Sequence, residues 1–190
     1  CYSLLLITRG RPEEAMEQIN LAIKLDPLNP LLKLLYSLDL LFVHQNNEAI
    51  KVCQDVLKMD PVNPIAYNLA FAFYLTGRYN EALEPLKSYY FNTYKNVVHS
   101  SALSNIKTDY FEALGREADT LAIQSKTTFI MPCDIAILYI MCGNKEEALK
   151  WMEIAYDARD PSLIYLRMPC FDSIRNEPRF QDIARNMKLL

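Results

Sequence analysis

The sequence contains little glycine and little histidine, and both shortages argue against enzymatic chemistry. Among 190 residues there are four glycines and two histidines. A phosphate-binding loop needs several glycines close together, whereas these glycines stand far apart, at positions 10, 77, 115 and 143. His44 and His99 are also distant in the chain, so an imidazole base would meet a cysteine nucleophile only through an unusual fold contact. We therefore expect no nucleotide binding, no cofactor and no catalysis.

Long apolar runs and blocks of like charge are missing as well. The longest apolar runs, residues 3–8 and 34–43, are shorter than the roughly 20 residues that a membrane helix needs. The 20 basic and 23 acidic residues are interspersed and give a net charge of −3, without the clustered basic face that nucleic-acid binding requires. We expect a chain that neither crosses a membrane nor binds nucleic acid directly. Because 51% of its residues are apolar, it can bury a sizeable core.

The five cysteines form no recognisable pattern. Their positions are an odd set with wide gaps, namely 1, 53, 133, 142 and 170. This spacing favours neither a disulfide framework nor a metal site, and it fits a reducing compartment such as the cytoplasm. Cys133 stands at an expected helix start, where the helix dipole can lower a thiol pKa, but a small buried filler is the preferred interpretation. Because the chain begins with Cys1 and a short apolar stretch, we expect it to be part of a longer polypeptide.

Two independent sequence markers recur with the same period. The segment Asp26-Pro27-Leu28-Asn29-Pro30 returns as Asp60-Pro61-Val62-Asn63-Pro64, at an offset of 34. A turn followed by Glu and Ala also recurs, and its alanines, at positions 15, 49, 82 and 148, are 34, 33 and 66 residues apart. The last gap corresponds to two repeats. A period of about 34 residues is typical of stacked helical hairpins.

Each residue type in the markers has a mechanical reason. Glycine ends a helix in the left-handed conformation, and Glu in the first turn of the next helix is stabilised by the helix dipole. Asp-Pro ends the second helix because proline disfavours helical geometry in the residue before it. The second proline then suits the start of a new helix. The expected repeat is therefore helix, turn, helix, turn.

These markers predict an all-α fold, an α-α solenoid of about five helix pairs. The fourth pair carries neither marker, yet its second helix has an unbroken apolar stripe. We therefore place Gly115 inside that helix, where a close helix contact would explain the glycine. The expected pairs are residues 2–9 with 12–25, 30–44 with 47–59, 64–76 with 79–91, 94–106 with 109–126, and 132–142 with 145–158.

At these positions the chain resembles the tetratricopeptide-repeat (TPR) family over residues 1–158. The best copy of the repeat is Pro64-Ile65-Ala66-Tyr67-Asn68-Leu69-Ala70-Phe71-Ala72-Phe73-Tyr74. The resemblance implies a right-handed TPR superhelix and a concave groove that binds another protein segment. It implies repeats at about 1–29, 30–63, 64–93, 94–131 and 132–158, followed by C-terminal capping helices at 159–190.

The C-terminal part also looks like the TPR module of bacterial signalling proteins. Such a module follows a winged-helix transcription-factor domain (CadC-like), a nucleotide cyclase domain or a protein kinase domain. The resemblance implies a sensing or docking role in a bacterial multidomain regulator, located in the cytoplasm, or in the periplasm if attached to a CadC-like membrane regulator. The residues that carry it are Cys133 to Ala136, Gly143 to Trp151, Tyr156 to Pro161 and Phe171 to Phe180.

One face of the first helix in each TPR repeat lines the family's groove. Here that face carries Tyr67, Phe71 and Tyr74, with Ile137 and Ile140 at the matching positions of the last pair. Aromatic anchors would suit an extended or helical peptide with apolar side chains. Since Tyr67 and Phe71 supply no cation, an acidic chaperone tail is not the expected ligand. The alternative is that these side chains pack against the next repeat. We expect a protein or peptide partner, or self-association.

The last segment is expected to cap the final repeat, because a solenoid must cover the apolar face of its end. The expected inner side consists of Phe171, Ile174, Phe180, Ile183 and Met187, and the outer side of Arg175, Arg179, Asp182 and Arg185. Two other functions stay open. A structural spacer would have a polar groove, whereas a receptor would leave an apolar patch. An enzyme is the most remote alternative.

Overall fold

The computed structural model describes residues 2–94 and 109–189. Within these ranges the chain consists of α-helices, short 3-10 helices and turns, with no strand, so the predicted all-α class is confirmed. The chain forms two compact units: Cys1–Tyr89 with Arg167–Pro169, and Tyr90–Leu166 with Cys170–Leu190. We call them the N-terminal unit and the C-terminal unit. The predicted helix at 94–106 lies almost wholly outside the described residues.

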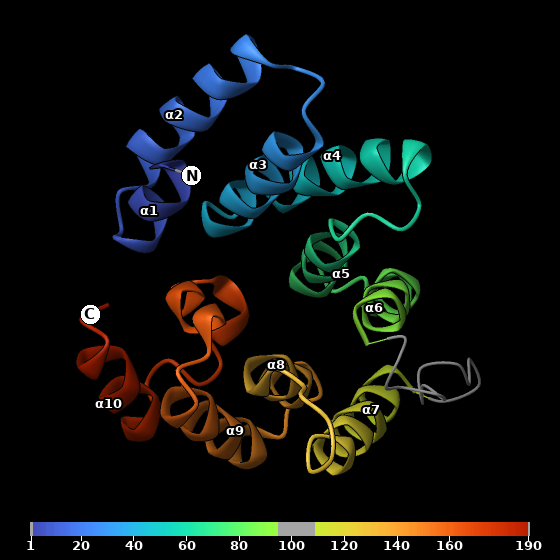
Figure 1. Cartoon of the computed structure of the whole chain (residues 1–190), viewed down its shortest axis with the longest axis vertical. Helices are drawn as coiled ribbons and strands as arrows, with labels where there is room; N and C mark the ends of the chain where they lie inside the picture. The colour runs from blue at the N-terminus through green and yellow to red at the C-terminus, as the bar shows by residue number, and fades with distance from the viewer. Residues whose placement is uncertain (1, 95–108, 190) are drawn as a thin grey trace. The chain divides into compact units, whose positions relative to one another are not determined.

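The N-terminal unit is built from successive helical hairpins (Figure 1). Within hairpins, α1 packs against α2 and α3 against α4; between hairpins, α2 contacts α3 and α4 contacts α5. The first helices also contact one another, α1 with α3 and α3 with α5. The helices are α1 (Tyr2–Thr8), α2 (Pro12–Leu25), α3 (Pro30–Phe42), α4 (Asn46–Met59), α5 (Ala66–Leu75) and α6 (Tyr79–Tyr94), whose residues from Tyr90 onward belong to the C-terminal unit.

The turn inside each hairpin has the same backbone geometry in all four marked copies. Gly10, Gly77 and Gly143 adopt φ values of 75°, 72° and 84°, and His44 adopts 59° at the corresponding place. In every copy the next amide donates a hydrogen bond to a carbonyl five residues earlier, as Arg11 does to Leu6 at 2.9 Å. This is the glycine-favouring helix ending that the sequence predicts. Histidine takes the same conformation at one copy despite its Cβ.

The Asp-Pro loops between hairpins are equally alike. The side chain of Asn29 donates to Asp26 at 2.8 Å, and its oxygen accepts from the Leu31 amide at 3.0 Å. Asn63 donates to Asp60 at 2.9 Å and accepts from the Ile65 amide at 3.1 Å. The recurrence of the sequence at an offset of 34 therefore corresponds to a recurrence of the same hydrogen bonds. The four marker alanines are all fully buried, as close helix crossings require: Ala15, Ala49, Ala82 and Ala148.

The C-terminal unit is centred on α8, whose ten residues are all buried. It packs against α7 on one side and α9 on the other, and α9 contacts α10. Only a helix surrounded by other elements can be buried on every side in this way. The remaining elements in chain order are α7 (Tyr110–Gln124), α8 (Pro132–Met141), α9 (Lys145–Asp157), η2 (Pro161–Tyr165), η3 (Pro169–Phe171) and α10 (Pro178–Asn186).

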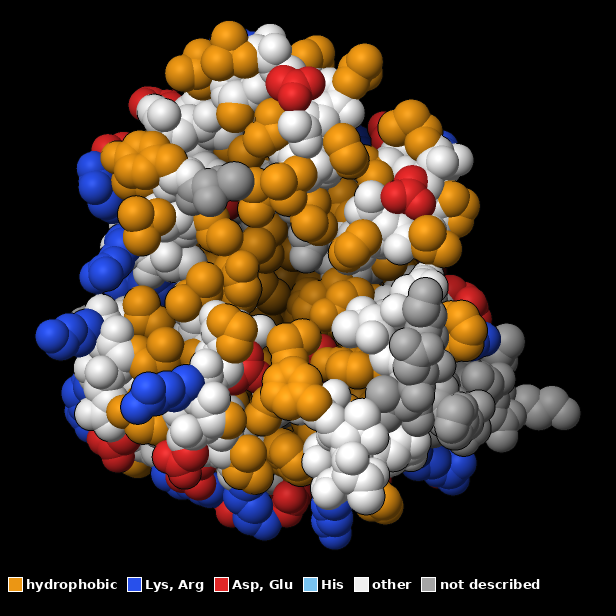
Figure 2. Space-filling model, viewed as in Figure 1, with side chains coloured by type: hydrophobic (Ala, Val, Ile, Leu, Met, Phe, Trp, Pro, Cys, Tyr) orange, Lys and Arg blue, Asp and Glu red, His pale blue; other side chains and the backbone are white. Residues whose placement is uncertain are grey.

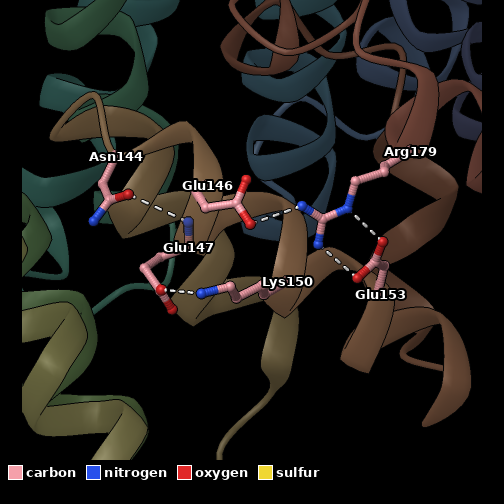
Figure 3. A network of polar contacts seen from close by, with 6 residues as sticks. All are labelled: Asn144, Glu146, Glu147, Lys150, Glu153 and Arg179. Carbon is pink, nitrogen blue, oxygen red and sulfur yellow. Dashed lines mark hydrogen bonds and ion pairs between the residues drawn. The ribbon is translucent and has the colours of Figure 1, made fainter.

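The last helix, α10, contacts α9, and an arginine on α10 forms ion pairs with glutamates of α9 (Figure 3). The Arg179 guanidinium donates to Glu153 at 2.6 and 2.7 Å and to Glu146 at 3.0 Å. Phe171, Ile174, Phe180 and Ile183 are buried as the sequence predicts, whereas Met187 is half-buried. Arg179 differs from the expected outward-facing charge, because it forms ion pairs with the helix that it covers.

Gly115 lies inside α7, as predicted, but not for the expected reason. A Cβ atom added there would meet only the Cys142 sulfur, at 3.9 Å. That distance is an ordinary van der Waals contact, so a methyl group has room. The close helix approach expected from the sequence is therefore wrong at this position.

Candidate protein-binding surface

Helix α5 carries a group of aromatic side chains that continues onto α6. The Tyr67 ring stacks on Tyr89, with ring centroids 4.1 Å apart, and meets Phe71 edge-on at 4.6 Å. Further along, Tyr74 and Tyr79 have centroids 5.9 Å apart. Tyrosine pairs of this kind present a rigid apolar ring with a polar tip, which suits protein recognition. We call Tyr67, Tyr74, Tyr79 and Tyr89 the tyrosine surface.

The predicted anchors differ in how much of their side chain is accessible. Tyr67 and Tyr74 are half-buried, and Phe71 is 1% exposed. Ile137 and Ile140, on α8 of the C-terminal unit, are 6% and 2% exposed. The structure thus brings Tyr67 and Phe71 into contact but gives Phe71 and the two isoleucines little surface to offer a ligand. Their burial favours the packing alternative, while their role in a groove stays a prediction.

A buried amide fixes the orientation of α5 against α3. The Asn68 side chain donates to the Ser37 hydroxyl at 2.8 Å and to the Leu34 carbonyl at 3.1 Å. Ser37 in turn donates to the same carbonyl at 2.8 Å. Because an unpaired buried amide would be costly, this network specifies one register between the two helices. It therefore sets which α5 side chains face outward, and the sequence gives no separate signal for it.

A second polar network holds the start of α8. The Tyr94 hydroxyl donates to the Asp134 carboxylate at 2.7 Å, and the Tyr90 hydroxyl donates to the Asp134 carbonyl at 3.1 Å. The Cys133 amide donates to the Asp160 carboxylate at 2.9 Å. These contacts tie the end of α6 and the turn before η2 to one helix end. Their partners are backbone and structural groups, so the network positions helices.

Asp39, on α3, is a buried acid in an apolar setting. It is 0% exposed, and neither carboxylate oxygen makes a hydrogen bond of ordinary geometry within the described residues. Burial raises the pKa of Asp39 to about 6, although the nearby Ser3 hydroxyl partly offsets this. A charged group without a partner destabilises the fold. Ionisation of Asp39 is therefore expected to make the stability of the N-terminal unit depend on pH.

The four cysteines that the structure describes show no sign of an activated thiol. Burial raises the pKa of Cys53 to about 12 and also raises the pKa values of Cys133, Cys142 and Cys170. All four are free thiols. For Cys133 this matches the buried filler, because burial and the nearby Asp160 and Asp134 all raise its pKa. Among residues 2–94 and 109–189, no three His, Cys, Asp or Glu side chains gather as a metal site would need.

Comparison with known proteins identifies no family for this chain. Neither a scan against models of protein families nor a search of curated proteins finds a match for this chain. Within the part of the chain that the structure describes, no helix has the length and apolar character that crossing a membrane requires. What remains is a set of repeated helical hairpins with a tyrosine surface on one of them.

Proposed function

We propose that this chain is a TPR-type helical-repeat scaffold that binds a segment of another protein on the tyrosine surface. The observation that carries the proposal is the repetition of both connections with the same hydrogen bonds, at the offset of a TPR repeat. Stacked hairpins form a preformed curved scaffold, which binds by surface complementarity and carries no chemistry of its own. The resemblance of the C-terminal part supports a narrower proposal, a sensing or docking domain of a bacterial multidomain regulator.

The tyrosine surface is the part of the scaffold best suited to recognition. Tyr67 and Tyr74 have accessible rings on a helix whose other side is anchored by buried residues and by Asn68. An anchor held in place loses little conformational entropy on binding, and tyrosine is enriched among residues that dominate binding energy. A peptide with apolar side chains is the ligand that this surface fits.

A structural spacer is the second candidate, and the burial of Phe71, Ile137 and Ile140 favours it. In a spacer these side chains only hold neighbouring helices together. The two candidates differ in one respect: the spacer has no ligand whose affinity depends on Tyr67 or Tyr74.

The test is selection of peptides from a random library displayed against the folded chain. The affinity of a selected peptide is then measured for wild type, for Tyr67→Ala/Tyr74→Ala and for Phe129→Ala. Phe129 is 78% exposed, on the loop between α7 and α8, and serves as the control aromatic. Phe71 is left intact because truncating a buried Phe costs about 3–5 kcal/mol of stability.

We expect the double variant to lose at least about tenfold in affinity, since truncated aromatic anchors typically cost more than 1 kcal/mol. Phe129→Ala should bind as wild type does. Circular dichroism shows whether the double variant is folded, and Tyr67→Phe, which keeps the ring, should retain binding. A folded double variant with unchanged affinity, or a library that yields no binder, would reject the tyrosine surface and leave the spacer.

A further inference from the structure

A separate set of exposed apolar side chains lies at the ends of α2 and α4 and on the loops that follow them. Leu25 and Leu28 are 79% and 91% exposed, and Met59 and Val62 are 81% and 63% exposed. They occupy matching places in successive repeats, because Met59 and Val62 follow Leu25 and Leu28 at the repeat offset of 34. We call these four residues the loop edge. Hydrophobic side chains are visible over these helix ends in Figure 2.

The fold itself does not require apolar side chains at these places. The residue ten positions after the marker alanine is Leu25 in the first repeat and Met59 in the second, but Asn92 and Ala158 in later ones. The Leu28 side chain, in the turn between two helices, packs against little of the protein, since Leu28 is 91% exposed. Large apolar side chains that the fold leaves in water at a repeated position indicate an interaction surface.

A hollow lies within the loop edge. Its volume is about 540 Å³, and Leu28 and Met59 are among its walls. Projecting side chains and a hollow thus adjoin on one surface, which allows a copy of that surface to interlock with it. Lys33, Asp55 and Asp60 also line the hollow.

The charges around the loop edge are balanced. Lys24 and Lys33 face no carboxylate within ion-pair distance among the described residues, while Asp26 and Asp60 accept hydrogen bonds only from neighbouring asparagines. Lys58 is already paired with its neighbour Asp55 at 2.8 Å. A surface with charges of one sign would repel a second copy of itself. Here the two lysines of one copy can pair with Asp26 and Asp60 of the other across a two-fold axis.

We propose that the loop edge is the interface of a two-fold symmetric dimer of this chain. Its exposed apolar side chains, together with the adjoining Leu31 at 53% exposure, amount to on the order of 600 Å², near the roughly 800 Å² that each partner contributes to a stable interface. A C2 pair is the commonest soluble assembly. The interface is independent of the tyrosine surface, so it goes beyond the proposed function.

Sedimentation equilibrium tests this proposal with the whole chain at concentrations up to about 200 µM, where a micromolar dimer is populated. Wild type should approach twice the 22.0 kDa mass of one chain. Leu28→Glu/Met59→Glu should weaken dimerisation at least about 100-fold, because it sets four carboxylates into one apolar interface. Both side chains are exposed, so the monomer should keep its helical circular dichroism.

The matched control is Ile123→Glu/Phe129→Glu, which introduces the same two charges at residues 66% and 78% exposed and should dimerise as wild type does. Wild type that stays monomeric at the highest concentration overturns the proposal, and so does a double variant that dimerises as strongly as wild type. A monomeric wild type whose selected peptides bind at Leu28 and Met59 overturns it too, because the occupant is then another protein. Peptide binding that depends on Tyr67 is unaffected by each of these results.

Discussion

Replacing Asp39 by asparagine should stabilise this protein at neutral pH. The carboxyl is 0% exposed and has no hydrogen bond of ordinary geometry to any residue that the structure describes, and burial raises its pKa to about 6. The ordinary value is 3.8. A pKa difference of this size between the folded and the unfolded chain lowers the free energy of unfolding by about 3 kcal/mol when Asp39 is ionised. Asparagine has nearly the same shape without the charge, so Asp39→Asn should recover about 2 to 3 kcal/mol at pH 7.

The dependence on pH follows from the direction of the pKa change. A carboxyl whose pKa is raised on folding binds its proton more tightly in the folded state, so protonation stabilises the fold. The destabilisation by ionised Asp39 is therefore complete above about pH 6 and absent below about pH 4. The gain from Asp39→Asn should be largest at pH 7, should shrink as the pH falls through 6, and should vanish near pH 4.

Urea unfolding followed by circular dichroism at pH 7, 5.5 and 4 measures this gain. The control is Asp55→Asn, since Asp55 is exposed and Lys58 lowers its pKa. That variant should show no gain at pH 7. An Asp39→Asn variant that is less stable than wild type at pH 7, or whose gain does not change with pH, would refute the view that this carboxylate is buried without a partner.

Three further substitutions should change stability in defined directions under the same urea assay. His44→Gly should stabilise by about 1 kcal/mol, because glycine takes the 59° φ without a Cβ clash; no gain would show that the turn has another conformation. Gly115→Ala should stabilise by about 0.5–1 kcal/mol, since the helix has room for a methyl group; a loss of stability would instead indicate a close helix contact at this position. Arg179→Met should destabilise by at most about 1 kcal/mol, less at high salt, because its ion pairs are partly exposed; a salt-independent loss would indicate packing instead.

The hairpins are predictable because their signals are local. A helix ending at Gly10 or Gly77 and a loop such as Asp26 to Pro30 depend on a few adjacent residues. The period then follows from repetition alone. The inner side of the cap is predictable from its apolar residues: Phe171, on η3, and Phe180, on α10, are both buried, with ring centroids 5.9 Å apart.

The candidate site is less predictable because α5 and α8 are apolar on nearly every side. Periodicity identifies a buried face only when another face is polar. For Tyr67, Phe71 and Ile137 the sequence therefore does not separate a groove from a core. In the structure Tyr67 is half-buried, whereas Phe71 and Ile137 are 1% and 6% exposed. Asp39 presents the same difficulty. An aspartate that interrupts an apolar run is expected to face solvent, yet the Asp39 side chain is buried, because tertiary packing decides burial.

The central claim, that this helical-repeat scaffold recognises a protein segment on the tyrosine surface, is tested most directly by nuclear magnetic resonance. A selected peptide is titrated into the ¹⁵N-labelled chain, and backbone amide shifts are followed residue by residue. The claim predicts that the largest changes cluster on α5 and α6, around Tyr67 and Tyr74. Changes confined to other helices, with the amides of α5 and α6 unmoved at saturation, would contradict it.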